Sequence, residues 1–306
     1  MVKLFNRLIK LTEQLRSVLS NSIPAYSCRK SKKTYKQPHL AIIWCLMKKL
    51  KTNYRGIIEQ LELMPGIMQA IGLERLPHFT TVNKFFLRTG TASMYSVLMH
   101  TTCLFPDRPG IAAADSTGYS GSHASRHYLW RIGLGSYTKR KHVKLSISIC
   151  TDAQCIMAAK ARIGPRNDNI DFPRLIRHSA RLKPEYMVAD KGYDSEANHE
   201  LARMLGIKPM IPLKRNKYGT VRKRQRRKML KEFDKDVYSR RSLVETVNSS
   251  MKRLMGSWVS SRSAIQQRKE LIGMCIVYNV HRYLSVSLIY WMFSTEPNRQ
   301  KLYKPK

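Results

Sequence analysis

The sequence predicts an α/β protein with an all-helical N-terminal domain. In residues 1 to about 100, Leu and Ile recur at spacings of three and four, strand-type alternation is absent, and Gly and Pro are few. Near residue 105 the pattern changes to short apolar runs that alternate with turn residues. We therefore expect a helical domain over residues 1–105, an α/β domain over 106–290 and a basic tail over 291–306.

The α/β region contains five apolar runs that predict strands, and the second and third of them are close enough to form a hairpin. The expected strands cover residues 110–115, 143–150, 154–164, 185–190 and 207–213. Helices are expected after Pro173 and over 194–206, where Asp194 or Ser195 caps the start and Gly206 ends the helix. This order predicts a sheet that is partly antiparallel.

One helix of the N-terminal region is a candidate for reading DNA. In residues 76–90, Thr80 or Thr81 is the expected N-cap and Gly90 the stop. The segment resembles the second half of a helix-turn-helix, although a plain helical hairpin fits equally well. On the first interpretation, Thr81 to Arg88 lie nearest the bases and expose Asn83, Lys84 and Arg88.

The charge of the chain indicates a polyanionic partner. Lys and Arg number 56 against 20 Asp and Glu, which gives a formal net charge of +36 and a pI near 10.3. Nucleic acid is the expected partner, because the cations are spread along the chain rather than gathered beside one apolar helix, as membrane binding would favour. Residues 271–293 are long enough to cross a bilayer, but Asn279, His281 and Arg282 lie at their middle, so we expect a buried helix.

The cysteines and histidines do not predict a metal site. The six cysteines include no CxxC pair, so we expect reduced, mostly buried thiols in a cytoplasmic, nucleoid-associated protein that is not exported. His123, His127 and His142 stand at no zinc-finger spacing and are interpreted as polar loop residues near the nucleic acid.

Two aspartates follow expected strands. Asp115 ends the run GIAAAD and Asp190 ends YMVAD, and ligands bind at the carboxyl ends of strands in open α/β sheets. Each could equally be a turn or cap residue. Asp171, before Phe172 and Pro173, is expected to be a helix cap, and the role of Asp168 is left open.

A third carboxylate lies on a helix expected over residues 238–258. At about 100° per residue, Tyr238, Arg241, Glu245 and Lys252 fall within an arc of about 60°. The opposite face is apolar and consists of Leu243, Val244, Val247, Met251, Leu254 and Trp258. The polar stripe could be an ordinary solvated face with an Arg241–Glu245 ion pair, or it could hold a functional glutamate among cations.

The order Asp115, Asp190, Glu245 resembles the RNase H-like catalytic core of DDE transposases from bacterial and archaeal insertion sequences. The spacing Tyr238-x2-Arg241-x3-Glu245-x6-Lys252 matches the Tyr-Arg-Glu-Lys signature of the insertion-sequence groups numbered four and five, and Asp190-x-Gly192-Tyr193 matches their second aspartate. The large β-rich insertion typical of group four is missing, so the chain is closer to group five. The resemblance covers roughly residues 76–285.

The resemblance implies specific roles for these residues. Asp115, Asp190 and Glu245 would be the catalytic residues and would hold two Mg²⁺ ions, for which Mn²⁺ should substitute, while Tyr238, Arg241 and Lys252 would contact DNA. The function implied is binding of terminal inverted repeats, cleavage of double-stranded DNA and joining to target DNA, with a homodimer or higher synaptic assembly. An RNase H-fold nuclease or resolvase, and a non-catalytic DNA-binding descendant, remain alternatives.

A strongly basic insert precedes the glutamate helix. Of residues 214–231, ten of eighteen are Lys or Arg and none is acidic, and the insert extends to about residue 235. It is either a solvated loop or a segment that follows DNA phosphates, and its position beside a DNA-cleaving site favours the second. The residues expected to bind phosphates are Arg222, Lys223, Arg224, Arg226 and Arg227.

Overall fold

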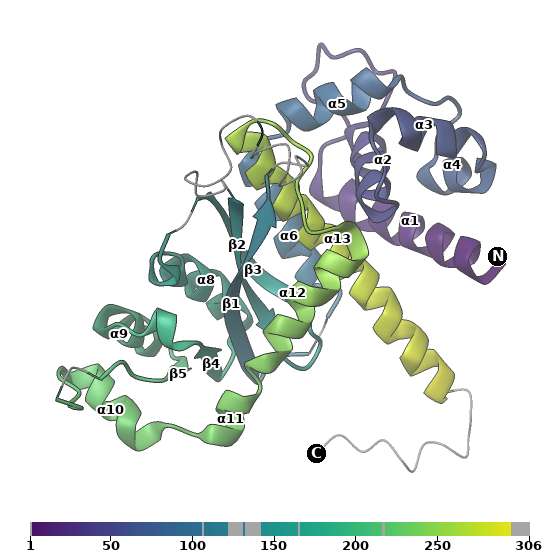
Figure 1. Ribbon diagram of the computed structural model, residues 1–306. Coiled ribbons are helices and arrows are strands. Elements are labelled where there is room, and N and C mark those ends of the chain that lie inside the picture. Colours follow the sequence, from purple (N-terminus) through teal and green to yellow (C-terminus); the bar gives the residue numbers. More distant parts are fainter. Residues whose placement is uncertain are drawn as a thin grey trace.

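The computed structural model describes residues 2–105, 107–121, 131, 142–164, 166–215 and 218–294, with side chains described from residue 5 to residue 287 within these ranges. His123, His127 and the last twelve residues of the expected basic tail lie outside them. An N-terminal group of helices lies on one side of a mixed sheet, and further helices cover the sheet's two faces (Figure 1).

The N-terminal region is helical, as the periodicity predicted. Its helices are α1 (Val2–Ser22), α2 (Gln37–Lys49), α3 (Tyr54–Glu62), α4 (Pro65–Ile71), α5 (Phe79–Arg88) and α6 (Thr91–Thr102). Local signals set several ends: the Asn53 side chain accepts from the first amides of α3, and Gly72 ends α4 in the left-handed conformation at φ +86°.

Helix α5 begins earlier than the sequence predicted. Phe79 is its first residue and His78 occupies the N-cap, so neither Thr80 nor Thr81 caps the helix. The Thr80 hydroxyl instead lies 2.8 Å from Nδ1 of His78. Gly90 does not terminate α5 directly, because Thr89 is the C-cap and Gly90 is the N-cap of α6.

The five-stranded sheet has the order β3-β2-β1-β4-β5. Its strands are β1 (Ile111–Ser120), β2 (His142–Cys150), β3 (Ile156–Ile163), β4 (Tyr186–Ala189) and β5 (Lys208–Met210). The expected β2–β3 hairpin is present, β1 pairs antiparallel with β2, and β1, β4 and β5 are parallel neighbours. The α/β class and the partly antiparallel sheet are therefore confirmed.

Two strand boundaries differ from the prediction. β1 does not end at Asp115 but continues to Ser120, because β2 supplies antiparallel hydrogen bonds along its whole length. β5 is shorter than the expected 207–213, since its neighbour β4 pairs only with Lys208–Met210. His142, expected in a loop, is the first residue of β2.

Two groups of helices cover the sheet, one on each face. On one face, α8 (Phe172–Ser179) and α9 (Glu196–Met204) enclose an apolar cluster that includes Ala112, Ala114 and Met187. On the other face, α12 (Ser242–Met255) packs on β1 and β2 and α13 (Ala264–Ser294) on β2 and β3, in a larger core that includes Ala113 and Val188. Helices α10 (Arg224–Glu232) and α11 (Lys235–Ser239) connect the two groups at the β5 side, and short 3-10 turns cover Asp168–Ile170, Ala180–Leu182 and Lys191–Tyr193.

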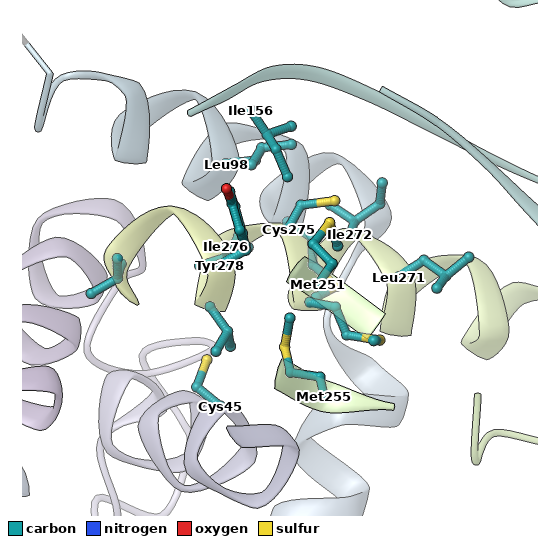
Figure 2. Packing of buried hydrophobic residues seen from close by; sticks show 14 of the residues in the cluster. Cys45, Leu98, Ile156, Met251, Met255, Leu271, Ile272, Cys275, Ile276 and Tyr278 are labelled. Atoms are coloured by element: carbon teal, nitrogen blue, oxygen red, sulfur yellow. The ribbon is translucent and has the colours of Figure 1, made fainter. Parts of the chain in front are cut away.

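Helix α13 joins the N-terminal helices to the sheet. Figure 2 shows its buried side chains beside residues from four other elements: Cys45 of α2, Leu98 of α6, Ile156 of β3, and Met251 and Met255 of α12. Residues 271–280 of α13 are all buried, which agrees with the expectation of a buried helix. In the part of the chain that the structure describes, no helix has the length and apolar character needed to span a membrane.

The helix expected over residues 238–258 is interrupted. α11 ends at Ser239 and α12 begins at Ser242, so Tyr238 belongs to one helix and Glu245 to the next. The predicted apolar face is correct for Val244, Val247 and Met251, which are buried. It is wrong for Trp258, because α12 stops at Met255 and Gly256 turns the chain at φ +92°, leaving Trp258 38% exposed.

Candidate active site

The register of β1 and β4 brings Asp115 and Asp190 together. The last parallel pair is Ala114 with Ala189, so the two aspartates are the next residues on adjacent strands, which run about 4.8 Å apart. Residues two apart on a strand share a face, and Ala113 and Val188 point into the core beneath α12 and α13. Both carboxylates therefore lie on the face that α12 covers.

A glycine fixes the position of the Asp190 carboxylate. Asp190 caps the short turn that follows β4, and its Oδ1 accepts a hydrogen bond from the Gly192 amide at 2.8 Å. A Cβ on residue 192 would stand only 2.8 Å from the same oxygen. Glycine at position 192 thus allows the carboxylate to approach the backbone, which gives a physical reason for the Asp-x-Gly pattern.

Glu245 lies in the first turn of α12, where the helix dipole favours a negative charge. Its Oε1 accepts a hydrogen bond from Nη2 of Arg241 at 2.6 Å. The ion pair proposed from the sequence is therefore present, but the Glu245 side chain is still 54% exposed and the Arg241 side chain 25%. The carboxylate is held by one partner and stays open to solvent.

The charges of these residues influence one another's protonation. Burial raises the pKa of Asp115 to about 6, and the negative charges of Asp190 and Glu245 add to the increase, while Arg241 opposes it. Burial also raises the pKa of Tyr238, again with contributions from Asp190 and Glu245. Three carboxylates on two strands and a helix therefore repel one another across a partly buried space.

Charges of the same residues also shift the pKa of Arg241. Burial alone would lower its pKa, but Glu245, Tyr238 and Asp115 outweigh that effect and the pKa is raised. The guanidinium is thus stabilised by two carboxylates of the site. Tyr238 and Arg241 lie at this site although they belong to different elements from those predicted.

Lys252 lies further along β1. Its Nζ is 5.4 Å from the ring centroid of Tyr119, which is four residues beyond Asp115 on the same face of the strand. Four residues of strand span roughly 13 Å. α12 therefore places Glu245 and Lys252 at two separate points along β1. Burial lowers the pKa of Lys252.

The donor set is compatible with a divalent cation. Asp115, Asp190 and Glu245 offer only carboxylate oxygens, the ligands preferred by Mg²⁺ and accepted by Mn²⁺. A bound cation would oppose both the burial and the repulsion that raise the Asp115 pKa. Among the described residues, however, no three His, Cys, Asp or Glu side chains are grouped closely enough to hold one ion. Glu245 is turned toward Arg241 instead.

The basic insert folds into a helix that is attached to α9. The cations Arg222, Lys223, Arg224 and Arg227 are exposed, as expected of phosphate-binding residues. Arg226 differs: its Nε and Nη2 donate to Asp194 at 3.0 and 2.7 Å, and its Nη2 also donates to the Lys214 carbonyl. Unlike the other expected phosphate ligands, Arg226 uses its guanidinium within the protein.

Two further acidic residues have structural partners that the sequence did not reveal. Asp171 occupies the N-cap of α8 as predicted, but its side chain makes no capping hydrogen bond, because its buried carboxylate binds Ser146 Oγ and Arg162. Asp168 contacts Ser116 and Lys144. Ser116 and Lys144, with His142, also line an open polar cavity of about 380 Å³ beside β1 and β2.

Residues 106–280 match the family model described as a transposase DDE domain, over more than half of the chain. The chain belongs to this family. A search of curated proteins found no match. The match includes Asp115, Asp190 and Glu245, and the mixed sheet with helices on both faces is the RNase H-like core expected of such a transposase. A DDE transposase acts on DNA, which agrees with the net charge of +36.

Proposed function

We propose that this chain is an insertion-sequence transposase that cleaves double-stranded DNA at the ends of its element and joins those ends to target DNA. The observation that supports the proposal is that the register of β1 and β4 places Asp115 beside Asp190, and that the charge of Glu245 on α12 acts on Asp115. The Tyr-Arg-Glu-Lys spacing around Glu245 favours insertion-sequence groups four and five, and the short insert favours group five.

Asp115, Asp190 and Glu245 would hold two Mg²⁺ ions, or Mn²⁺ in their place. When bound, such ions activate an attacking oxygen and neutralise charge on the phosphate. The chain's own contribution is to position the carboxylates: the Gly192 amide orients Asp190, and the register of β1 and β4 places Asp115 beside it. Glu245 can bind a cation only by leaving Arg241, and its exposure permits that movement.

The cations around Glu245 would grip the DNA backbone next to the cut. Arg241 can fork onto a phosphate once its pair with Glu245 opens, whereas Lys252 provides a compact charge further along β1. Tyr238 is partly exposed beside Arg241 and can donate its hydroxyl to a phosphate oxygen. The same helix region would then hold both the metal ligand and the strand to be cut.

The exposed face of the basic insert would follow phosphates outside the cut site. Arg222, Lys223, Arg224 and Arg227 face solvent, and α10 is held in place by α9, since Glu196 accepts from the amides of Gln225 and Arg226. A fixed row of cations binds any sequence alike. Arg226 would serve this surface indirectly, by anchoring α10 to Asp194.

Sequence recognition would come from the N-terminal helices. A catalytic core that must act on any target phosphate does not itself select a sequence. On α5, Lys84, Leu87 and Arg88 are exposed and Asn83 is partly exposed, while Val82, Phe85 and Phe86 fix the helix on the core. We infer that α5 reads the terminal inverted repeats and that a homodimer or larger assembly pairs two ends. Association with the nucleoid would follow.

The test is cleavage and strand transfer by the full chain. The substrate is a duplex that carries the DNA flanking its gene, with Mg²⁺ or Mn²⁺. Asp115→Asn, Asp190→Asn and Glu245→Gln should each abolish both products and leave DNA binding within a few fold of wild type. Mg²⁺-dependent cleavage by any of the three would refute the assignment. Cleavage without strand transfer would indicate a nuclease or resolvase, and binding without cleavage by wild type would indicate a non-catalytic DNA-binding protein.

A further inference from the structure

Lys269 of α13 is buried and binds the end of α5. Its Nζ donates to the carbonyls of Phe86, Leu87 and Thr89 at 2.7, 3.1 and 2.9 Å, and its residue is only 2% exposed. The last carbonyls of a helix have no partners within the helix, and a cation is favourable there. The ammonium thus uses three donors to hold the last turn of α5 from a residue 180 or more positions away.

Glu270, the next residue, holds two other elements. Its Oε1 accepts from the Ser260 amide and its Oε2 from the Ser261 amide, both at 2.8 Å. Its Oε1 also binds Nζ of Lys48 in α2, and the Glu270 side chain is 1% exposed. Ser260 and Ser261 follow α12, the helix that contains Glu245. Glu270 therefore fixes the segment after α12 to both α13 and α2.

Consecutive residues of one helix thus connect the N-terminal region to the glutamate helix. Both are charged and buried, positions where such residues are rare and costly unless fully hydrogen-bonded. Two apolar side chains could pack α13 against the same neighbours. What hydrogen bonds add is direction, because each fixes the position of one backbone segment relative to a specific atom of α13.

We propose that Lys269 and Glu270 are positioning residues that set the distance along DNA between the sequence read by α5 and the phosphate cut beside Glu245. The inference rests on the proposed function, in which α5 contacts the terminal repeat and the three carboxylates cut. If α5 and α12 are fixed to one helix at adjacent residues, a protein bound in one register presents a single phosphate to the site. If one connection is broken, we expect cuts at several neighbouring phosphates instead of one.

The experiment maps cut positions at nucleotide resolution. The full chain is incubated with Mn²⁺ and an end-labelled duplex that carries the DNA flanking its gene, and the variants are Lys269→Met and Glu270→Gln. Wild type should cut at one position. Folded Lys269→Met should spread its cuts over several neighbouring phosphates, with the total cut reduced less than tenfold, and Lys269→Arg should restore a single position. A folded Lys269→Met that cuts only at the wild-type position overturns the inference.

Two controls keep the test decisive. Arg162→Met breaks a different, partly buried ion pair, between β3 and Asp171 at the start of α8, so it should lower stability without spreading the cuts. Spreading in that variant as well would overturn the inference, because loss of stability alone would explain it. If Lys269→Met does not fold, Glu270→Gln gives the same test, since it keeps the shape of the side chain. Wild type that cuts at no preferred position would refute the proposed function instead.

Discussion

The two arginine–carboxylate pairs on either side of α11 have the same chemistry but different surroundings. Asp194 accepts from Arg226 twice, accepts from the Lys214 amide at 2.6 Å, lies 3.0 Å from Nε2 of His199, and is completely buried. Glu245 accepts one hydrogen bond from Arg241 and is half exposed. The first pair fastens a basic helix to the core, and the second can open. The number of partners and their burial separate a structural ion pair from a functional one.

The Arg226–Asp194 and Arg241–Glu245 pairs should differ most in their contribution to the stability of the protein. Arg226→Met leaves the buried Asp194 carboxylate without its main partner and should lower the free energy of unfolding by about 3–5 kcal/mol. Arg241→Met, at a largely solvated pair, should lower it by about 1 kcal/mol or less. Urea unfolding of both variants measures the difference. Equal losses would contradict the distinction between the two pairs.

In DNA cleavage, Arg241→Met should have a larger effect than Arg226→Met. If Arg241 grips the phosphate, Arg241→Met should lower the cleavage rate roughly 10²–10³-fold, as the loss of a charge-stabilising donor does in other enzymes. Arg226→Met, assayed at a temperature where it is folded, should lose far less, because its guanidinium faces Asp194. Single-turnover cleavage at saturating protein separates the rate from DNA affinity. A folded Arg241→Met with wild-type cleavage would remove Arg241 from the site.

The Asp194 carboxylate should make the stability of the protein depend on pH in acid. Burial acts to raise the pKa of Asp194, but His199, Arg226 and the Lys214 amide outweigh it, and the pKa is lowered from 3.8 to about 2. A lowered folded-state pKa stabilises the protein above the unfolded value, so this contribution is complete above about pH 4 and is lost as the pH falls toward 2. It amounts to about 2 kcal/mol.

The matched variant isolates this contribution from other carboxylates. Asp194→Asn should be less stable than wild type at neutral pH, and the difference between the two proteins should shrink as the pH is lowered from about 4 to about 2. Denaturant unfolding at several pH values across this range measures it. A difference that stays constant with pH would show that Asp194 does not titrate with a lowered pKa.

The smallest effects should come from the exposed cations of the basic insert. Arg222→Gln, Lys223→Gln, Arg224→Gln and Arg227→Gln should each weaken binding to all duplexes alike and reduce the log–log salt slope by up to about one unit per lost contact. Glu185 and Lys208 form an exposed pair elsewhere, so Lys208→Gln is a matched control that should leave the slope unchanged. Weakened binding to one sequence with an unchanged slope would contradict phosphate binding.

Local pattern was sufficient to predict most elements of the fold. The strands, the β2–β3 hairpin and the N-terminal helices follow from periodicity and turn residues. Asp115 and Asp190 were selected because strands were expected to end there, and Glu245 because it stands at a known spacing. Boundaries that depend on a partner were missed: β1 continues past Asp115 because β2 is beside it. The break between α11 and α12 lies at Arg240 and Arg241, residues that carry no helix-breaking signal.

The partners of buried charges were also beyond sequence reasoning. Asp194 and Ser195 were both candidates for the helix cap, and Ser195 takes that role, but the sequence did not show that Asp194 binds Arg226, thirty-two positions away. Lys269 and Glu270 stand in an ordinary charged stretch, and only the packing of α13 shows that both are buried. Composition identifies a basic segment, but three-dimensional contacts decide which of its arginines face solvent.

Mn²⁺ binding tests most directly whether Asp115, Asp190 and Glu245 form one metal-binding site. Electron paramagnetic resonance counts free Mn²⁺ in titrations of the full chain, without DNA and independently of cleavage. Wild type should bind Mn²⁺, and Asp115→Asn, Asp190→Asn and Glu245→Gln should each weaken binding at least tenfold, whereas Glu232→Gln on the exposed side of α10 should not. Three carboxylate variants that bind Mn²⁺ as tightly as wild type would contradict the account.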